Sequence, residues 1–151
     1  MKKIFILFFF IITSCGFQPL YKVNEGVNEI KIKEIKHVGD EILSKKISDN
    51  LPFTVNKNDE ILNQIIIEAK KSKVEASKNS KGQVTSYKAI LVVKFKILDN
   101  NGNFIDEKLF QDEFYYDTNE NKFKLKEYEN KIEKNLINNI VEGIIIYLNY
   151  L

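Results

Sequence analysis

Hydrophobic and polar positions alternate between residues 27 and 35, where Ile30 and Ile32 are separated by charged side chains. A period of two is typical of a strand with one buried face. After Asp40 the apolar residues recur instead at helical intervals, until Pro52. Because Asp is a favoured N-cap and Pro ends a helix, we predict a helix of about three turns between them. Its apolar positions are Ile42, Leu43, Ile47 and Leu51.

Three longer strands are predicted next, over residues 61–76, 85–97 and 104–116. The second is apolar at odd positions and carries further apolar residues on its other face midway, so we expect its middle to be covered on both sides. The third has the same mixed pattern, and we expect the same of it. Asn101 and Gly102 lie between these two strands, and an Asn-Gly pair predicts a tight antiparallel hairpin, because both residues tolerate positive φ.

The longest helix is predicted at the C-terminal end of the sequence. Asp117 and Glu120 have the spacing of a capping box. From Leu125 to Leu148 apolar residues recur every three or four positions, a stripe that most simply packs on the sheet and secondarily offers a partner-facing surface. The elements show no internal repeat. They predict one α+β domain over 27–151, with two helices packed on one face of a four-stranded, largely antiparallel sheet.

The first fourteen residues have the layout of a secretory signal peptide. Lys2 and Lys3 precede an apolar run over 4–12, and the small residues Thr13 and Ser14 follow. A bilayer-spanning helix needs about 20 apolar residues, and this run is shorter. We therefore expect residues 1–14 to be removed.

Composition excludes several classes of protein. The chain is 44% hydrophobic and 29% charged, which is typical of a globular protein, and its net charge of +2 comes without any Arg. A nucleic-acid-binding protein would usually be far more basic. The lone Cys15 excludes an internal disulfide and a Cys-based zinc site, and the lone His37 leaves few catalytic arrangements. We find no phosphate loop, nucleophile elbow or metal spacing. The sequence predicts a protein that is not an enzyme and holds no metal or cofactor.

The residues around Cys15 resemble the lipobox of bacterial lipoproteins, since an aliphatic residue, Ile12, and two small residues precede the Cys. The resemblance implies that Cys15 is acylated with fatty acids such as palmitate and becomes the first residue of the mature protein. Two or more acyl chains give stable membrane anchoring. Residues 15–26 would then form a lipidated tether. The alternative is that Cys15 is an ordinary small residue after an uncleaved signal.

The run from Cys15 to Tyr21, Cys-Gly-Phe-Gln-Pro-Leu-Tyr, resembles the start of the lipopolysaccharide-assembly lipoprotein family LptE. A second likeness lies at Lys81–Tyr87, where the family often has Gly and then Thr-x-Tyr leading into a long strand. Two positions depart from the family, since Ser86 stands where many relatives carry a basic residue and Lys22 where Gly is common. The alternative is a plain tether that its Pro keeps extended.

The resemblance to LptE implies an α+β fold and a role as partner and plug of the LptD β-barrel, in a one-to-one complex that inserts lipopolysaccharide into the outer leaflet. It implies binding without chemistry. Gly16 after the lipidated Cys fits sorting to the outer membrane, with the domain on the periplasmic face.

One local excess of positive charge lies between Glu68 and Lys88, with six lysines against two glutamates. We expect three of them, Lys78, Lys81 and Lys88, to meet the phosphates of lipopolysaccharide as point charges at the end of a hairpin. A solvated hairpin end is the alternative.

Two other functions remain open at this point. A structural envelope lipoprotein that binds peptidoglycan or another complex would have no barrel partner. A membrane-anchored enzyme would need a catalytic group, for which His37 is the remaining candidate.

Overall fold

The computed structural model describes residues 30–59 and 63–151, which form an α+β fold with a mostly antiparallel sheet, as predicted. The predicted signal peptide and tether lie outside the described residues. The elements, in chain order, are β1 (Ile30–Ile32), β2 (Glu34–Gly39), α2 (Glu41–Ser48), β3 (Phe53–Val55), β4 (Gln64–Lys78), β5 (Val84–Leu98), β6 (Phe104–Asp117) and α3 (Lys122–Leu148).

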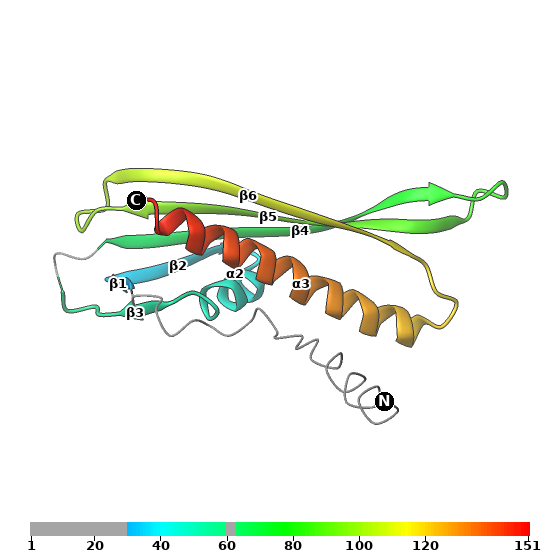
Figure 1. The fold of residues 1–151 in the computed structure, drawn as a ribbon, viewed down its shortest axis with the longest axis horizontal. Helices are drawn as coiled ribbons and strands as arrows, with labels where there is room; N and C mark the ends of the chain where they lie inside the picture. Colours follow the sequence, from blue (N-terminus) through cyan, green and yellow to red (C-terminus); the bar gives the residue numbers. More distant parts are fainter. Residues whose placement is uncertain (1–29, 60–62) are drawn as a thin grey trace, which may run out of the picture.

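The main sheet has four strands in the order β2-β4-β5-β6 (Figure 1). β2 pairs with β4 in parallel, and β4, β5 and β6 are joined by antiparallel pairing. The last three strands are long and run along the longest axis of the domain, so the β4–β5 hairpin reaches beyond the rest of the sheet. A second, two-stranded sheet, in which β1 and β3 pair in parallel, was not predicted.

The single strand predicted over 27–35 is wrong, because the chain changes sheets at Lys33. β1 ends before this residue and β2 begins after it. Ile32, at an even-numbered position, is 2% exposed, whereas Ile35, at an odd-numbered position, packs against the core. The bend at Lys33 accommodates this change of phase, and the Lys33 amide donates to the carbonyl of Asn63 at 2.8 Å.

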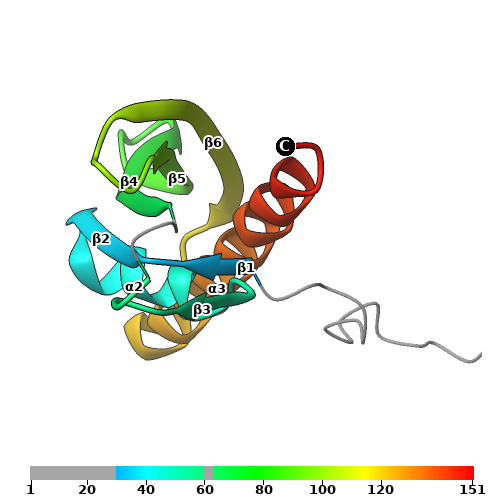
Figure 2. The same ribbon diagram turned by 90° about the vertical axis from the view of Figure 1, so that its left-hand side faces the viewer.

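The core joins one face of the main sheet to both helices. Ile67 on β4 pairs with Phe95 on β5, and both side chains are fully buried. α2 contacts β2 and β4, whereas α3 contacts β5 and β6 (Figure 2). The apolar stripe predicted on the C-terminal helix is buried in this core, where each fully buried aliphatic side chain contributes about 1.5–3 kcal/mol. The buried residues of α3 are Ile132, Leu136, Ile137, Ile140, Val141 and Ile144.

The opposite face of the sheet is open within the described part of the chain, so the expectation that β5 and β6 are covered on both sides is wrong there. Ile90 and Val92 on β5 are only half-buried, and Leu109 and Tyr115 on β6 are exposed. Ion pairs cross this face, such as Lys96 with Glu107. The apolar residues of this face therefore pack against charged neighbours rather than against a second layer.

The two hairpin turns at the ends of β5 share one geometry. In the turn after β5, the Gly102 amide donates to the Asp99 carbonyl, and the Asp99 amide to the Asn103 carbonyl. In the turn before β5, Asn79, Gly82 and Gln83 repeat this pattern. Gly102 and Gly82 alone have positive φ in these turns, whereas Asn101 does not. The predicted antiparallel hairpin is confirmed, but its turn is a longer one than a two-residue Asn-Gly turn.

Both helices begin at side-chain caps, one predicted and one missed. Asp40 caps α2 as predicted, since its carboxylate accepts from the Leu43 amide at 3.0 Å, although the helix ends at Ser48, earlier than expected. The capping box predicted at Asp117 is wrong, because Asp117 is the last residue of β6. Asn121 caps α3 instead, and its side-chain oxygen accepts from the amides of Phe123 and Lys124.

Candidate functional site

The predicted lipidation site, Cys15, and the LptE-like motif that follows it lie outside the described residues. The second likeness to that family lies within them, at the turn between β4 and β5 and the start of β5. The candidate site that the structure describes is therefore the β4–β5 hairpin and the surfaces beside it.

Lys78 and Lys81 lie together at the tip of this hairpin. Asn79 shapes the tip, because its side-chain oxygen accepts from the amides of Lys81 at 2.9 Å and Gln83 at 3.0 Å. Gly82 completes the turn with a φ of 77°. The local sequence thus fixes a polar loop that presents two ammonium groups to solvent.

Lys88 lies farther back and is not part of the tip. Val84 on β5 pairs with Lys78, and Lys88 follows four residues later, about 14 Å along the strand. Its ammonium pairs with Glu113 of β6 at 3.2 Å and lies 5.3 Å from the centroid of the Tyr115 ring. The structure therefore brings two of the three predicted lysines together and places the third in a separate contact.

Most of the local charge excess is balanced by carboxylates that are distant in sequence. Of the six lysines between Glu68 and Lys88, four form ion pairs with carboxylates, and only one of these carboxylates, that of Glu75, comes from the same hairpin. Among the described residues, Lys70 and Lys81 form no ion pair. The pairs are Lys71–Glu133, Lys73–Glu129, Lys78–Glu75 and Lys88–Glu113.

The ion pairs of Lys78 and Lys88 favour the protonated form of each ammonium group. The hydrogen bond to Glu75 raises the pKa of Lys78, and the hydrogen bond to Glu113 raises the pKa of Lys88, with Tyr115 adding to the effect. Since an unperturbed lysine is already protonated at neutral pH, both groups stay cationic there. The paired carboxylates screen part of the electric field of each ammonium group, but both groups keep their positive charge.

A cluster that the sequence analysis missed lies where α3 faces the hairpin. Glu129 of α3 accepts from the Tyr116 hydroxyl at 2.9 Å and from the Lys73 ammonium at 2.6 Å. The same ammonium lies 3.7 Å from the centroid of the Tyr87 ring. Burial alone would lower the pKa of Lys73, but the contacts with Glu129 and Tyr116 raise it. A signal was present, since Tyr87 and Tyr116 both occupy the apolar phase of their strands.

Two hollows flank this cluster. One, of about 440 Å³, lies between the end of β6 and the start of α3, and Tyr128 lines it. The other, of about 270 Å³, lies between α3 and the first half of the hairpin, with Lys71 and Lys126 at its border. Tyr116 lines both. The side of the sheet that faces α3 thus offers aromatic and cationic surface, from Tyr116, Lys71 and Lys126 among others.

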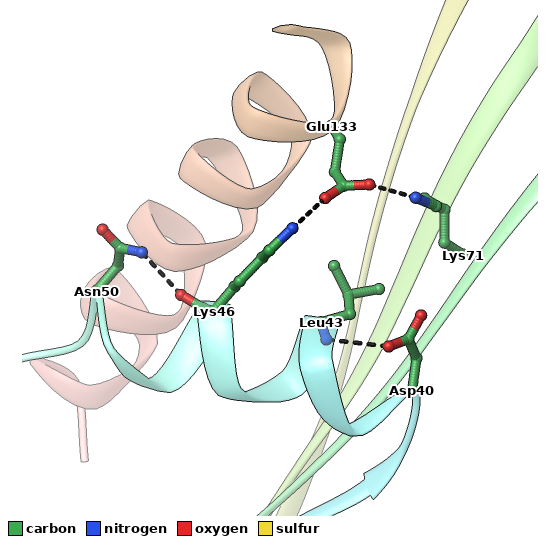
Figure 3. Close-up of polar contacts among 6 residues, drawn as sticks. All are labelled: Asp40, Leu43, Lys46, Asn50, Lys71 and Glu133. Atoms are coloured by element: carbon green, nitrogen blue, oxygen red, sulfur yellow. Dashed lines mark hydrogen bonds and ion pairs between the residues drawn. The ribbon is translucent and has the colours of Figure 1, made fainter. Parts of the chain in front are cut away.

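Glu133 ties this region to the rest of the domain. Its carboxylate accepts from Lys46 of α2 at 2.7 Å and from Lys71 of β4, so that one side chain links three elements (Figure 3). Burial raises the pKa of Glu133, but the hydrogen bonds from the two lysines outweigh it and lower the pKa below its usual value. The arrangement is a structural clamp.

His37 contacts a hydroxyl group but not in a catalytic geometry. Its Nε2 lies 2.9 Å from the Ser48 hydroxyl, and that hydroxyl donates to the carbonyl of Lys45. The serine proton is therefore directed away from the imidazole, whereas a general base would have to accept it.

Nowhere in 30–59 or 63–151 do three His, Cys, Asp or Glu side chains gather to hold a metal ion. No helix in these ranges is long and apolar enough to cross a bilayer.

Solved structures of bacterial lipoproteins share this fold. Rare lipoprotein B from Shewanella oneidensis is 13% identical, with a TM-score of 0.59 over 78% of this chain and 94% of that one. A minor lipoprotein from Acinetobacter baumannii is 16% identical, with a TM-score of 0.58 over 80% and 92%. Lipoprotein B from Nitrosomonas europaea is 17% identical, with a TM-score of 0.55 over 83% and 87%.

The chain has the fold of these bacterial lipoproteins. At such low identity the likeness concerns the fold alone. No protein-family model and no curated protein sequence matches the chain.

Proposed function

We propose that the protein is an outer-membrane lipoprotein of the LptE type. It is anchored through acylated Cys15 on the periplasmic face, it partners and plugs the LptD β-barrel in a one-to-one complex, and it binds lipopolysaccharide during assembly into the outer leaflet. The likeness of the described domain to rare lipoprotein B, which has the LptE fold, carries the proposal. The motif from Cys15 to Tyr21 supports the same family and supplies the acylated cysteine of the proposal.

The mechanism is binding without covalent chemistry. Lys81 presents an ammonium group that has no ion-pair partner among the described residues, at the exposed tip of the hairpin. Lys78 and Lys88 pair with the exposed carboxylates of Glu75 and Glu113. Because an exposed ion pair is worth about 0–1 kcal/mol, a lipid A phosphate can replace either carboxylate at little cost. Each lysine would hold phosphate as a point charge rather than through a bidentate pair of hydrogen bonds.

The ligand half of the proposal is tested with a charge-reversed hairpin. We expect the triple variant Lys78→Glu, Lys81→Glu and Lys88→Glu to bind lipopolysaccharide at least about tenfold more weakly, since one lost hydrogen bond to a charged group is worth about 1.5–3 kcal/mol. Binding of the purified full-length protein to immobilised lipopolysaccharide measures the effect, with dephosphorylated lipopolysaccharide as the second ligand.

A matched control separates local contacts from net charge. The triple variant Lys45→Glu, Lys57→Glu and Lys134→Glu makes the same change in charge at exposed positions outside the hairpin. We expect it to bind nearly as well as the wild type. Equal weakening of both triple variants, or unchanged binding of the hairpin variant, would remove the role of the hairpin lysines.

A further inference from the structure

The larger of the two hollows, about 440 Å³ in volume, lies between the end of β6 and the start of α3. We call it the β6–α3 hollow. Because β6 is an edge strand, side chains from both of its faces reach a hollow beside its last residues. Figure 1 shows this part of the chain at the same end of the domain as the tip of the β4–β5 hairpin. Three tyrosines and three other polar residues are among those that line it, Tyr115, Tyr116, Tyr128, Asp117, Thr118 and Lys124.

Four polar groups of this lining have no partner within 30–59 and 63–151. The Asp117 carboxylate and the Lys124 ammonium form no ion pair or hydrogen bond there, and the hydroxyls of Thr118 and Tyr128 form no hydrogen bond. The set contains a charged acceptor, a charged donor and two hydroxyls that can do either. The hollow therefore gathers hydrogen-bonding groups of each kind that a polar ligand can use.

Aromatic rings line the same hollow. Tyr115 is 59% exposed and Tyr128 45% exposed. Tyr116 packs edge-to-face on Tyr128 with 6.2 Å between the ring centroids, and its hydroxyl is fixed by Glu129. A sugar ring offers C–H groups on its faces, which pack on aromatic rings, and hydroxyl groups on its rim, which need both donors and acceptors. Exposed tyrosines among unpartnered polar groups thus suit a sugar.

The backbone beside the hollow is held in place without a ligand. Directly after β6, the Thr118 amide donates to the Thr85 carbonyl at 2.9 Å. The Asn119 side chain accepts from the Asn121 amide at 2.9 Å, and Asn121 in turn caps α3. Because this connection is already ordered, a ligand that binds there loses little free energy to ordering the chain.

The position of Lys88, apart from the hairpin tip, places it beside this hollow. Lys88 is the cross-strand neighbour of Tyr115, and its ammonium lies 5.3 Å from the centroid of that ring. Lys124 supplies a second ammonium group, in the lining itself. The Asp117 carboxylate would repel a ligand that is negative all round. The charges therefore fit a ligand with a neutral ring and separate anionic substituents.

We propose that the β6–α3 hollow binds a sugar ring of a phosphorylated saccharide. The ring lies against Tyr115 and Tyr128, and its anionic substituents meet Lys88 and Lys124. The volume of the hollow is within the range of about 300–1,000 Å³ that is typical of small-molecule sites. This inference rests on the proposed function and deepens it, because the ligand would be the sugar part of lipopolysaccharide. The two lysines of the hairpin tip would then meet another part of the same molecule.

A tyrosine at each end of α3 provides the test and its control. Tyr128→Ala removes a ring of the hollow, whereas Tyr150→Ala removes an 87% exposed ring at the other end of the helix. The purified full-length protein is titrated in a calorimeter with the delipidated, phosphorylated saccharide of lipopolysaccharide. We expect Tyr128→Ala to bind it at least about fivefold more weakly and Tyr150→Ala to bind it as the wild type does.

Asp117→Asn separates a sugar site from a site for a bare anion, with inorganic phosphate as the second probe. In a sugar site the Asp117 carboxylate accepts from ligand hydroxyls, and such a hydrogen bond is stronger when the acceptor is charged. We therefore expect Asp117→Asn to weaken saccharide binding. In an anion site the same change would remove a repulsion and strengthen the binding of saccharide and phosphate alike, which would overturn the inference.

Equal saccharide affinities of the wild type and Tyr128→Ala would also overturn it, as would a preference for a disaccharide fragment of peptidoglycan. Circular dichroism checks that Tyr128→Ala folds. If it does not, Lys124→Ser, at an exposed position, takes its place with the same expected weakening. Intact lipopolysaccharide separates the two proposals. If the wild type binds it but not the saccharide, the proposed function stands and this inference fails, whereas binding of neither removes both.

Discussion

Tyr147, in the last turns of α3, donates a hydrogen bond to the Asp106 carboxylate on β6, with 2.5 Å between the two oxygens. Burial, together with this bond, raises the pKa of Tyr147 to about 12. The same bond lowers the pKa of Asp106 below its ordinary value of 3.8. The contact fastens the C-terminal end of the helix to the edge strand of the sheet.

We expect Tyr147→Phe to lower the melting temperature near neutral pH, because the ring remains while the hydrogen bond is lost. The deficit relative to wild type should shrink in alkali. The pKa of Tyr147 is higher in the folded protein, so the stabilisation is complete below pH 10 and is lost as the pH rises through about 12. Thermal unfolding followed by circular dichroism measures both proteins across this range.

The same deficit should shrink in acid. The pKa of Asp106 is lower in the folded protein, so the stabilisation is present above pH 3.8 and is lost as the pH falls through the folded value. A difference in melting temperature that stays constant from acid to alkali would mean that the hydrogen bond does not contribute to stability.

The long elements could be predicted from sequence because each carries its own period over many residues. The stripe of α3 and the odd-numbered core positions of β5 are visible in the chain and are buried in the fold. The small β1–β3 sheet could not be predicted in this way, since three-residue strands are too short to show a period. The step from Ile32 to Ile35 did signal the change of sheets, because a spacing of three breaks an alternation of two.

Gly39 at the end of β2 should tolerate a side chain much less well than Gly82. Both have positive φ, at 76° and 77°, which costs a residue with a Cβ about 1–2 kcal/mol. A Cβ at Gly39 would also lie 2.5 Å from the carbonyl oxygen of Ala69, whereas a Cβ at Gly82 would have no described atom within 4 Å. We expect Gly82→Ala to lose about that amount of unfolding free energy and Gly39→Ala clearly more, as measured by urea unfolding. Equal losses would contradict the close packing of β2 on β4.

The lysine site was only partly predictable for a different reason. A count of charge along the hairpin cannot include partners that the fold brings from elsewhere, and Lys71, Lys73 and Lys88 take carboxylates from α3 and β6. The sequence located the hairpin and its exposed tip, but the pairing of strands and the packing of α3 determine which ammonium groups keep no ion-pair partner.

Glu133→Gln should destabilise the domain by about 1 kcal/mol, since it removes the charge that two lysines share and exposed ion pairs are worth about 0–1 kcal/mol each. Glu127→Gln is the control, because its single pair with Lys131 is exposed. We expect its effect to stay within about 0.5 kcal/mol.

The contribution of Glu133 to stability should also fall in acid. The pKa of Glu133 is lowered in the folded protein, so the stabilisation is present above the usual 4.5 and is lost as the pH falls through the folded value. Urea unfolding at neutral and acidic pH measures both variants, and equal values would show that Glu133 is not a clamp.

The most direct test of the proposed function is affinity purification of the tagged, full-length protein from outer-membrane extracts in mild detergent, with mass spectrometry of the proteins that accompany it. A parallel preparation of the Cys15→Ser variant controls for the anchor. The proposal predicts a large β-barrel protein in a one-to-one ratio with the tagged protein. Recovery of the protein alone, or with peptidoglycan-associated proteins, would contradict the LptE-type role and favour a structural envelope lipoprotein.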